Sequence, residues 1–401
     1  MSRPASLSVF HRIWRKLPQR QRRRFFAWVT AGLMPGVRAE YPRQASGVII
    51  AGEFSRDSGL GEGARLMVAA LRKSGILCAT WDTETCRLTG EAVGPGAPLI
   101  MHVNAPMFPS ALLRMPRTLR TSRKVIGYWA WELPLVPATW KHARKHVHEI
   151  WAPSRFTADA LTALRRPVRV VEHPVARAEG KPSIRKRASF GLPEDAVVVL
   201  VSFSLASSMV RKNPLDTIMA FRKAFGDRPD RFLLLKIGHT DHYPEDMKAI
   251  HKAIAEASNI RIDTQHYNGA DRLALMACSD IVFSLHRSEG FGLVVAEAMM
   301  LGRCVIATDW SATAEFMDST CGLPICYDLT PAHDPRGVLE MPQTHWAHPD
   351  VSAAVQALCL AADNPELRSR LGKAAQARIA KRLDGSSLLK AVQAAGVEAW
   401  R

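Results

Sequence analysis

Short apolar runs alternate with segments of helical period along most of this chain, from Gly47 onward. Each run is followed by turn residues, a pattern typical of parallel β-strands connected by right-handed helical crossovers. The alternation stops between residues 176 and 194, where glycines, prolines and basic residues gather, and it restarts at Val197. The pattern therefore predicts an α/β protein with two doubly wound, Rossmann-like parallel-sheet units.

Ligands are expected in the cleft between the two units, because open parallel sheets bind ligands beyond the carboxyl ends of their strands. The predicted parts are a basic segment (1–43), a first unit (44–178), a linker (179–194), a second unit (195–383) and a C-terminal helix (384–401). The predicted strands cover residues 48–54, 77–82, 99–104, 125–131, 149–153, 168–173, 197–203, 232–237, 260–263, 281–285, 304–308 and 323–327. The predicted helices cover residues 61–74, 139–148, 157–165, 214–225, 245–257, 270–278, 293–301 and most of 348–401.

Composition agrees with a globular chain and excludes several classes of protein. A chain of 401 residues that is 47% hydrophobic and 23% charged is too long for one core and too apolar for disorder. It contains no run of about 18 apolar residues, so we expect no transmembrane helix. The seven cysteines are scattered without a C-x-x-C pair. We therefore expect neither a disulfide framework nor a metal site, and a reducing, cytoplasmic compartment.

The first 43 residues hold about half of the excess positive charge. The formal net charge is +17, and residues 1–43 contain ten Lys or Arg against the single acid Glu40. An apolar block (25–34) follows three arginines, and we interpret the segment as an amphipathic anchor on an anionic membrane surface. This interpretation places the protein on the inner face of the membrane. A helix before Pro18 would carry one apolar stripe, formed by Leu7, Phe10, Trp14 and Leu17.

Three other interpretations of this basic segment stay open. A signal peptide would need a shorter charged region, and residues 37–40 make a poor cleavage site. Nucleic-acid binding would be accompanied by zinc-finger spacing or an RNA-binding aromatic signature, and because the rest of the chain has neither, no nucleic-acid partner is expected. The segment would also suit a solvated tail.

Two glutamates eight residues apart lie at the junction between a predicted strand and the next helix. Glu289 comes shortly after the strand that ends at Leu285, and Glu297 lies within the helix. Gly290 and Gly292 let the backbone approach a ligand closely, and free N–H groups at a helix start attract anions. Glu297 would accept hydrogen bonds from two neighbouring hydroxyls of a ribose. Alternatively, Glu289 caps the helix and Glu297 is a solvated helix residue.

At this junction the sequence resembles glycosyltransferase family 4, which has the GT-B fold. The resemblance covers the second unit best and extends more loosely over residues 47–383. It implies that Glu289 lies beside the transferred sugar and that Glu297 holds the ribose of a sugar nucleotide. It also implies backbone contacts from Gly290 and Phe291 to sugar hydroxyls. The residues that carry it are HRSEGFGL at 286–293, EAM at 297–299, Gly302, VIAT at 305–308 and Trp310-Ser311.

A pair of basic residues opens another helix of the second unit. Arg211 and Lys212 precede Pro214 and follow the strand over 197–203 and a small polar loop. A cation here would face the cleft and neutralise the charge that builds on a leaving nucleoside diphosphate, without a metal ion. The resemblance implies this role for Lys212, with Arg211 beside it. Alternatively, Lys212 is a solvated residue at a helix start.

The sequence departs from the family at three places. Relatives often have an arginine about six residues before the lysine, and this chain has Ala206 there. Many relatives have a sugar-contacting histidine around the position of Glu132. Ser311 and the helix start at Gly292 would lie at the donor. After the position of Ser311, relatives commonly continue with Gly-Asn, whereas this chain has Ala-Thr. Stabilisation of the leaving group is therefore expected to be weaker or differently built.

A glycine-rich loop (59–64) opens the helix that contains Arg65, and Asp82 ends the following strand. The loop has the form G-x-G-x-x-A and is followed by an acid, so it would be a dinucleotide fingerprint. Such a fingerprint follows its strand directly, whereas here four residues separate the first glycine from the strand end at Phe54. The resemblance instead puts this loop, with Gly61, under the donor phosphates or the acceptor. Arg65 would then contact an acidic group of the acceptor. A plain tight turn is the simpler alternative.

Two more residues at strand ends are candidates on the acceptor side. Glu132 follows a strand of the first unit, and it would be either a cleft carboxylate or a capping group beneath aromatic packing. His102 also lies at a strand end, where a satisfied core histidine is the commoner case.

Together these features predict a retaining glycosyltransferase that moves a sugar from a nucleoside-diphosphate sugar to an acceptor hydroxyl. We expect no cofactor, and an acceptor from surface polysaccharide or lipid-linked glycan synthesis bound by the first unit. Because the chain has no obvious covalent nucleophile, the resemblance implies front-face attack, with the leaving phosphate taking the acceptor proton. Three alternatives stay open: another GT-B sugar-nucleotide enzyme such as an epimerase, an NAD-dependent oxidoreductase that uses the Gly59–Gly63 loop, and a catalytically silent membrane scaffold.

Overall fold

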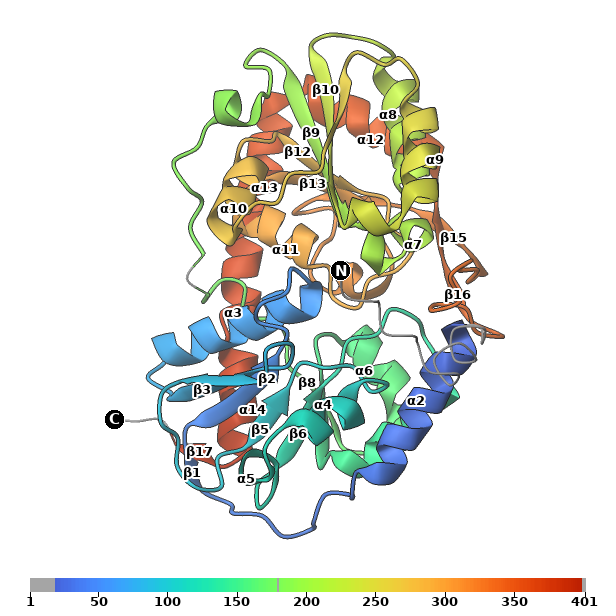
Figure 1. The fold of residues 1–401 in the computed structure, drawn as a ribbon. Coiled ribbons are helices and arrows are strands. Elements are labelled where there is room, and N and C mark those ends of the chain that lie inside the picture. The colour runs from blue at the N-terminus through green and yellow to red at the C-terminus, as the bar shows by residue number, and fades with distance from the viewer. Residues whose placement is uncertain (1–18, 179, 399–401) are drawn as a thin grey trace, which may run out of the picture.

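The central strands of both main sheets are buried on their two faces, which explains the continuous apolar runs of the sequence. The computed structural model describes residues 19–178 and 180–398, and these residues form two α/β domains that face each other (Figure 1). In β9 (Val197–Ser204), successive side chains enter two different cores. A strand that is covered on both faces needs apolar side chains at nearly every position.

The N-terminal domain is built on a sheet with the strand order β4-β3-β2-β5-β6-β7-β8. Neighbouring strands are parallel except for β4, which is antiparallel to β3. The strands are β2 (Val48–Gly52), β3 (Cys78–Asp82), β4 (Arg87–Gly90), β5 (Leu99–Met101), β6 (Val125–Tyr128), β7 (Glu149–Ala152) and β8 (Val168–Val170). The helices are α2 (Gln19–Leu33), α3 (Gly59–Lys73), α4 (Phe108–Arg114), α5 (Arg117–Arg120), α6 (Arg155–Leu161) and the 3-10 helix η1 (Ala138–His146).

The C-terminal domain has a fully parallel sheet with the strand order β11-β10-β9-β12-β13-β14. Besides β9, its strands are β10 (Arg231–Gly238), β11 (Ile260–Asp263), β12 (Ile281–Ser284), β13 (Cys304–Thr308) and β14 (Leu323–Ile325). The helices between them are α7 (Met209–Lys212), α8 (Pro214–Phe225), α9 (Pro244–Ile254), α10 (Gly269–Ala277), α11 (Leu293–Met300) and the 3-10 helix η6 (Ser311–Glu315).

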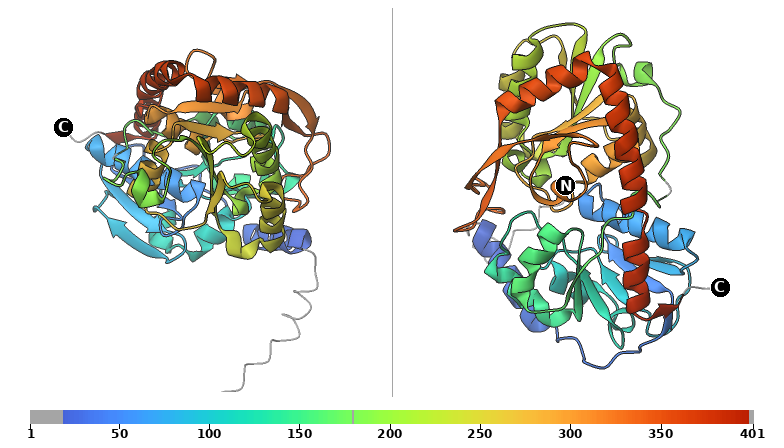
Figure 2. Two further views of the ribbon diagram at one scale, coloured as in Figure 1. Left: turned by 90° about the horizontal axis from the view of Figure 1, so that it is seen from above. Right: turned by 180° about the vertical axis from the view of Figure 1, so that it is seen from behind.

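The C-terminal helices join the two domains. After α12 (Val351–Asp363), the long helix α13 (Pro365–Arg382) packs against α11, and α14 (Ser386–Ala394) continues onto the N-terminal domain (Figure 2). Leu388 on α14 is fully buried in the core that also contains Val48 of β2. A short parallel pair, β17 (Val397–Glu398) with β1 (Ala45–Ser46), completes this attachment. The described residues therefore begin and end in the same domain.

Helix α2 packs on the N-terminal domain through small side chains. Ala27 and Ala31 are buried against this domain, where α2 contacts α4 and η1. Phe25, Trp28 and Leu33 are exposed. The apolar stripe predicted before Pro18 lies outside the described residues. Within residues 19–178 and 180–398, no helix combines the length and the apolar character needed to cross a bilayer.

Most predicted strands and helices are found, but the structure differs from the sequence prediction at several places. Strand β4, which is antiparallel to β3, was not predicted. The helix predicted over 139–148 is the 3-10 helix η1. The strand predicted over 323–327 ends at Ile325, and the chain then forms an antiparallel hairpin of β15 (Tyr327–Pro331) and β16 (His345–Pro349). Trp346 of this hairpin is buried with the core of the N-terminal domain. Its burial depends on contact with the N-terminal domain, which the local sequence pattern of the hairpin does not reveal.

We expect the attachment of α14 to stabilise the whole protein. Leu388→Ala leaves a cavity in a fully buried core and is expected to lower the free energy of unfolding by about 2–5 kcal/mol. Urea unfolding followed by circular dichroism measures this change. Lys390→Ala, on the exposed side of the same helix, is the control and should change stability by less than about 0.5 kcal/mol. Equal effects of the two substitutions would contradict the packing of α14 described above.

Candidate active site

A buried carboxylate between two cations lies where β9 and β12 end. Glu289 Oε1 is 2.5 Å from Lys212 Nζ and 3.1 Å from Arg211 Nη1. Both cations lie on α7, directly after β9 and its loop, whereas Glu289 lies between β12 and α11. Three of the residues predicted from the sequence are therefore brought together.

Arg211 is fixed mainly by main-chain oxygens. It is 3% exposed, and its guanidinium donates to Ser288 O at 2.8 Å and to Ser207 O at 3.2 Å. The main chain of Arg211 is fixed as well, because its carbonyl accepts from the N–H of Arg287 at 2.8 Å. Lys212 is more accessible, with 18% of its side chain exposed. Arg211 thus holds the Glu289 loop in place, and Lys212 is the more accessible cation of the pair.

The charges of this cluster shift the pKa values of its members. Burial alone would raise the pKa of Glu289, but Lys212 and Arg211 outweigh it and hold the pKa at about 2. Burial lowers the pKa of Lys212, and Glu289 opposes this. Burial also lowers the pKa of His286 to about 4. Glu289 is therefore an ionised hydrogen-bond acceptor at neutral pH and cannot act as a general acid.

The Gly290 main chain forms part of the interface between the domains. Its carbonyl accepts from Ser154 Oγ at 2.7 Å and from Thr157 Oγ1 at 3.1 Å, both on the N-terminal domain. A Cβ atom at Gly290 would lie 2.9 Å from Trp131 O, so only glycine fits this approach. Phe291 is 6% exposed and packs edge-on against His173, with ring centroids 4.8 Å apart.

Gly292 and Ser311 shape the Glu289 loop from the C-terminal side. Gly292 has a φ of +92°, and a Cβ atom there would lie 2.4 Å from Thr313 Cγ2. The Glu289 N–H donates to Ser311 Oγ at 2.8 Å. Ser311 therefore orients the loop that carries the carboxylate. Thr313, one of the two residues at which this chain differs from the family's Gly-Asn, thus packs against Gly292.

Glu297 is buried behind an arginine that the sequence analysis missed. It is 4% exposed, and Oε1 accepts from Arg272 Nη2 at 3.0 Å. Burial raises the pKa of Glu297, and Arg272 opposes this rise. Arg272 lies on α10, 25 residues earlier in the chain. No spacing rule connects the two positions, so the pair became visible only in the folded protein.

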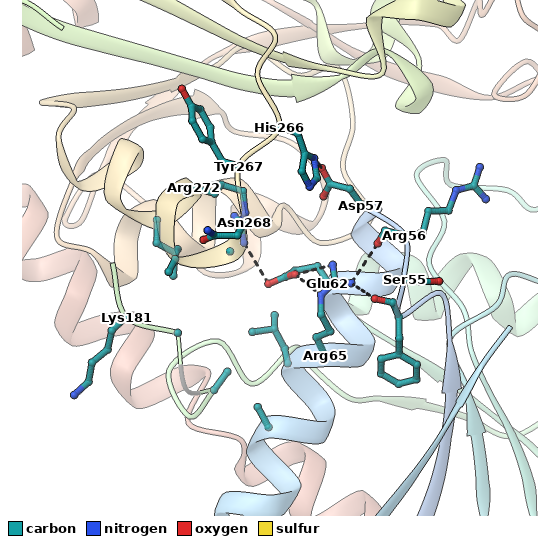
Figure 3. Close-up of a pocket in the computed structure, with 18 residues that line it drawn as sticks. Ser55, Arg56, Asp57, Glu62, Arg65, Lys181, His266, Tyr267, Asn268 and Arg272 are labelled. Carbon is teal, nitrogen blue, oxygen red and sulfur yellow. Dashed lines mark hydrogen bonds and ion pairs between the residues drawn. The ribbon is translucent and has the colours of Figure 1, made fainter. Parts of the chain in front are cut away.

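A pocket of about 440 Å³ opens beside this pair, between the start of α3 and the start of α10 (Figure 3). Arg272 lines the pocket, together with Arg65 and Glu62 of the N-terminal domain. His266 and Tyr267 line it from the loop between β11 and α10. The pocket thus contains donors, acceptors and an aromatic ring from both domains.

The predicted acceptor-side residues lie in different surroundings. Arg65 lines the pocket and donates to Phe54 O at 2.9 Å. Glu132 is 3.8 Å from Arg211, and burial together with the nearby Glu289 raises its pKa. His102 is fully buried and stacks on Tyr128, with ring centroids 4.2 Å apart. In this structure His102 is therefore a core histidine, away from the exposed surface of the cleft.

The glycine loop that opens α3 does not have the form of a dinucleotide site. Strand β2 ends at Gly52 and α3 begins at Gly59, whereas the fingerprint turns directly from strand to helix. A Cβ atom at Gly61 would lie 2.4 Å from Glu53 O, and its N–H donates to Ser58 Oγ at 3.0 Å. The Asp82 carboxylate accepts from the backbone N–H groups of Ser55, Glu84 and Thr85. The described residues contain no group of three His, Cys, Asp or Glu side chains arranged to hold a metal ion.

Part of this chain is similar to a known protein family. Residues 198–339 match the family described as glycosyl transferases group 1, and this stretch contains Lys212, Glu289, Arg272 and Glu297. This part of the chain is similar to the group 1 glycosyl transferases. The match agrees with the resemblance seen in the sequence. No curated protein matches the chain.

Solved structures of glycosyltransferases share the fold. The Anabaena protein HepE, recorded with UDP and glucose, is 14% identical with a TM-score of 0.62, covering 87% of this chain and 98% of HepE. Sucrose-phosphate synthase of Thermosynechococcus elongatus is 16% identical with a TM-score of 0.61, covering 86% of this chain and 98% of that protein. A mutant of S. aureus TarM, recorded with fondaparinux, alpha-GlcNAc-glycerol and UDP, is 13% identical with a TM-score of 0.52. That match covers 75% of this chain and 55% of TarM, so the chain spans about half of TarM. At these identities the likeness shows the fold, which is GT-B.

The pKa of Glu289 predicts how acid affects the stability of the C-terminal domain. Its folded-state pKa of about 2 lies below the ordinary value of 4.5, so its stabilising effect is complete above pH 4.5 and is lost as pH falls toward 2. Glu289→Gln is therefore expected to lose less stability than the wild type between pH 5 and pH 2.5. Urea unfolding at both pH values measures the difference, with the exposed Glu366→Gln as control. If Glu289→Gln lost as much stability as the wild type between pH 5 and pH 2.5, the pairing of Glu289 with Lys212 would be contradicted.

Proposed function

We propose that this protein is a retaining glycosyltransferase that moves a sugar from a nucleoside-diphosphate sugar to an acceptor hydroxyl. The observation that carries the proposal is the cluster of Lys212, Arg211 and Glu289 in the part of the chain that matches group 1 glycosyl transferases. A partly accessible lysine beside a buried, ionised carboxylate can bind both the diphosphate and the sugar of one donor. The acceptor belongs in this proposal to surface polysaccharide or lipid-linked glycan synthesis.

Lys212 is the group proposed to stabilise the leaving diphosphate. When a sugar nucleotide enters, its phosphate oxygens compete with Glu289 for the ammonium group, which lies 2.5 Å from Oε1 in the free protein. A preformed cation in a site with little water stabilises developing negative charge more than it would in solvent. Arg211 supplies a second positive charge but is held by main-chain oxygens. Arg211 thus replaces only in part the positive charge of the arginine that relatives often have at the position of Ala206.

Glu289 is proposed to orient the sugar through its hydroxyl groups. Its oxygens accept hydrogen bonds, because the carboxyl stays ionised at neutral pH. In the proposed front-face reaction, the acceptor oxygen bonds to the anomeric carbon while the bond from that carbon to the phosphate oxygen breaks. The proton of the acceptor hydroxyl passes to the leaving diphosphate. The new bond forms on the face that the diphosphate leaves, so the anomeric configuration is retained.

Glu297 is proposed to accept the ribose hydroxyls, with Gly290, Phe291, Gly292 and Ser311 shaping the donor site around Glu289. The acceptor is proposed to bind on the N-terminal domain, where Glu132 and Arg65 are the candidate contacts. Glu132 lies near the cluster, because its Oε1 is 3.8 Å from Arg211 Nη2. Arg65 lines the pocket between the domains.

The first test is ligand-dependent thermal unfolding with UDP, GDP, ADP and NAD. A ligand that binds only the folded protein raises the melting temperature with its concentration. We expect one nucleoside diphosphate to raise it and NAD to leave it unchanged. A shift with NAD alone would favour the oxidoreductase, and no shift with any of them would favour the silent scaffold.

Substitution of Lys212 tests the catalytic assignment. Lys212→Ala is expected to lower turnover of the donor about 100-fold, because it removes a charge aimed at the leaving group. Release of nucleoside diphosphate in the presence of an acceptor glycan measures this rate. The control is Lys223→Ala, an exposed lysine on α8. Unchanged turnover in Lys212→Ala would contradict the assignment, and sugar conversion that needs no acceptor would favour the epimerase.

Helix α2 is proposed to hold the protein on an anionic membrane surface at the inner face of the membrane. Trp28 is 61% exposed and Leu33 is 69% exposed, while the same helix is anchored to the domain by Ala27 and Ala31. Exposed basic residues lie on the two elements that α2 contacts, α4 and η1. Aromatic side chains flanked by cations favour the interface of a bilayer with anionic headgroups. The exposed basic residues on these elements are Arg114, Lys141, Arg144 and Lys145.

Vesicle binding tests this surface directly. The double variant Phe25→Ser, Trp28→Ser is expected to weaken binding to phosphatidylglycerol vesicles about tenfold, because it removes the apolar contacts. Cosedimentation at low and high salt measures binding, with phosphatidylcholine vesicles for comparison. The matched control is Leu215→Ser, Met219→Ser, which removes two exposed apolar residues of α8. Equal binding of the two double variants would contradict the membrane proposal.

A further inference from the structure

Four charged side chains form a continuous line from one domain to the other. On α10, Arg272 uses Nη2 to contact both Glu297 Oε1 at 3.0 Å and Glu62 Oε1 at 3.2 Å, and its Nη1 donates to Glu297 Oε2. Glu62 belongs to α3 of the N-terminal domain and is held by Arg65, whose Nη2 lies 2.9 Å from Glu62 Oε2. The carboxylate proposed to bind ribose is therefore tied to the opposite domain through one guanidinium.

Arg272 also lies between this carboxylate and the open pocket. Arg272, Arg65 and Glu62 line the pocket, and Glu297 does not (Figure 3). A nucleoside that enters from the pocket meets the guanidinium before it reaches the buried carboxylate. Arg272 must then share the Glu297 oxygens with the incoming hydroxyls.

We propose that Arg272 is the positioning residue of the nucleoside site, which sets Glu297 to accept the ribose hydroxyls and couples the occupied site to Glu62 of the N-terminal domain. This inference rests on the proposed function. It concerns a residue to which neither the family match nor the fold gives a role.

The geometry of an arginine suits this position. A carboxylate offers about four acceptor directions, and the two-pronged contact from Arg272 uses one on each oxygen. The other directions stay available to two neighbouring hydroxyls, and the carboxylate plane is fixed before the ligand arrives. A lysine has a single charged nitrogen, so it cannot hold both oxygens of Glu297 and also reach Glu62 in this planar arrangement.

The contact with Glu62 gives the nucleoside site a connection across the cleft. Glu62 lies in the first turn of α3, the helix that the glycine loop opens. An arginine shared between two carboxylates responds to the position of each, so a ligand on Glu297 changes how Arg272 holds Glu62. Binding of the donor nucleoside and the position of α3 are therefore linked.

Isothermal titration calorimetry with UDP, GDP and ADP, each beside its 2′-deoxy form, tests the positioning role. The wild type is expected to prefer one ribonucleotide over its 2′-deoxy form. Arg272→Met is expected to lower the affinity for that ribonucleotide about tenfold and to bring the ratio of the two affinities close to one. Arg272→Lys keeps the positive charge but should not restore the wild-type ratio of the affinities for the ribonucleotide and its 2′-deoxy form. A loss of folding stability alone would not change this ratio.

The matched control is Arg378→Met, which also removes an arginine from an ion pair, with Asp318, on a comparably exposed part of α13. It should keep both the affinity and the ratio of the wild type. If the wild type binds a ribonucleotide and Arg272→Met keeps its ratio, the inference is wrong and the proposed function stands. If the wild type binds none of the nucleoside diphosphates, the proposed function fails and the inference fails with it.

A double-mutant cycle tests the link to the other domain. Glu62→Gln, Arg272→Met and their combination are compared for affinity toward the same ribonucleotide. Because both residues belong to one chain of contacts, the combined loss is expected to be smaller than the product of the separate losses. A combined loss equal to that product would overturn the coupling.

Discussion

The burial of one carboxylate beside two cations is the constraint on which the cleft depends. An ionised group removed from water is tolerated only when a partner of opposite charge and fixed hydrogen bonds replace the solvent. The Glu289 carboxylate obtains these from Lys212 and Arg211, and the main-chain N–H of Glu289 donates to Ser311 Oγ. Because the partners come from loops after different strands, the pairing fixes three loops relative to one another. The chemistry proposed for the site uses the charges that hold these loops together.

The two domains are held against each other by groups beside this cluster. The main chain at Gly290 accepts from the N-terminal domain, and the Glu315 carboxylate accepts from the N–H groups of Arg155 and Phe156 at the start of α6. Such contacts satisfy buried polar groups, which would cost free energy if left unpaired. The C-terminal helices add an apolar attachment through Leu388. The cleft is thus bordered by contacts that are specific for one relative position of the domains.

The sequence predicted the parallel sheets well, because a strand buried on both faces must be apolar along its length. The strand over 304–308 and the helix over 214–225 have the predicted bounds. The hairpin of β15 and β16 was missed, since no residue of β15 is fully buried and its partner strand begins 14 residues after β15 ends. Gly290 and Glu297 were recognised as candidates from their place at a strand-to-helix junction and from the family resemblance. The role of Gly290 in the domain interface was not recognised from the sequence, because Trp131 approaches Gly290 from the other domain.

The sequence by itself determined the class of fold, the two-unit organisation and the location of the carboxylate pair at a strand-to-helix junction. These features follow from periodicity and from neighbours along the chain. Only the tertiary structure decided which charges meet. Arg272 joins Glu297 to Glu62, although Glu62 lies 210 residues away in the sequence, and His102 lies in a core instead of at the cleft. Ion pairs and burial depend on distances in space, and these exist only once the two sheets have packed and the domains have closed on each other.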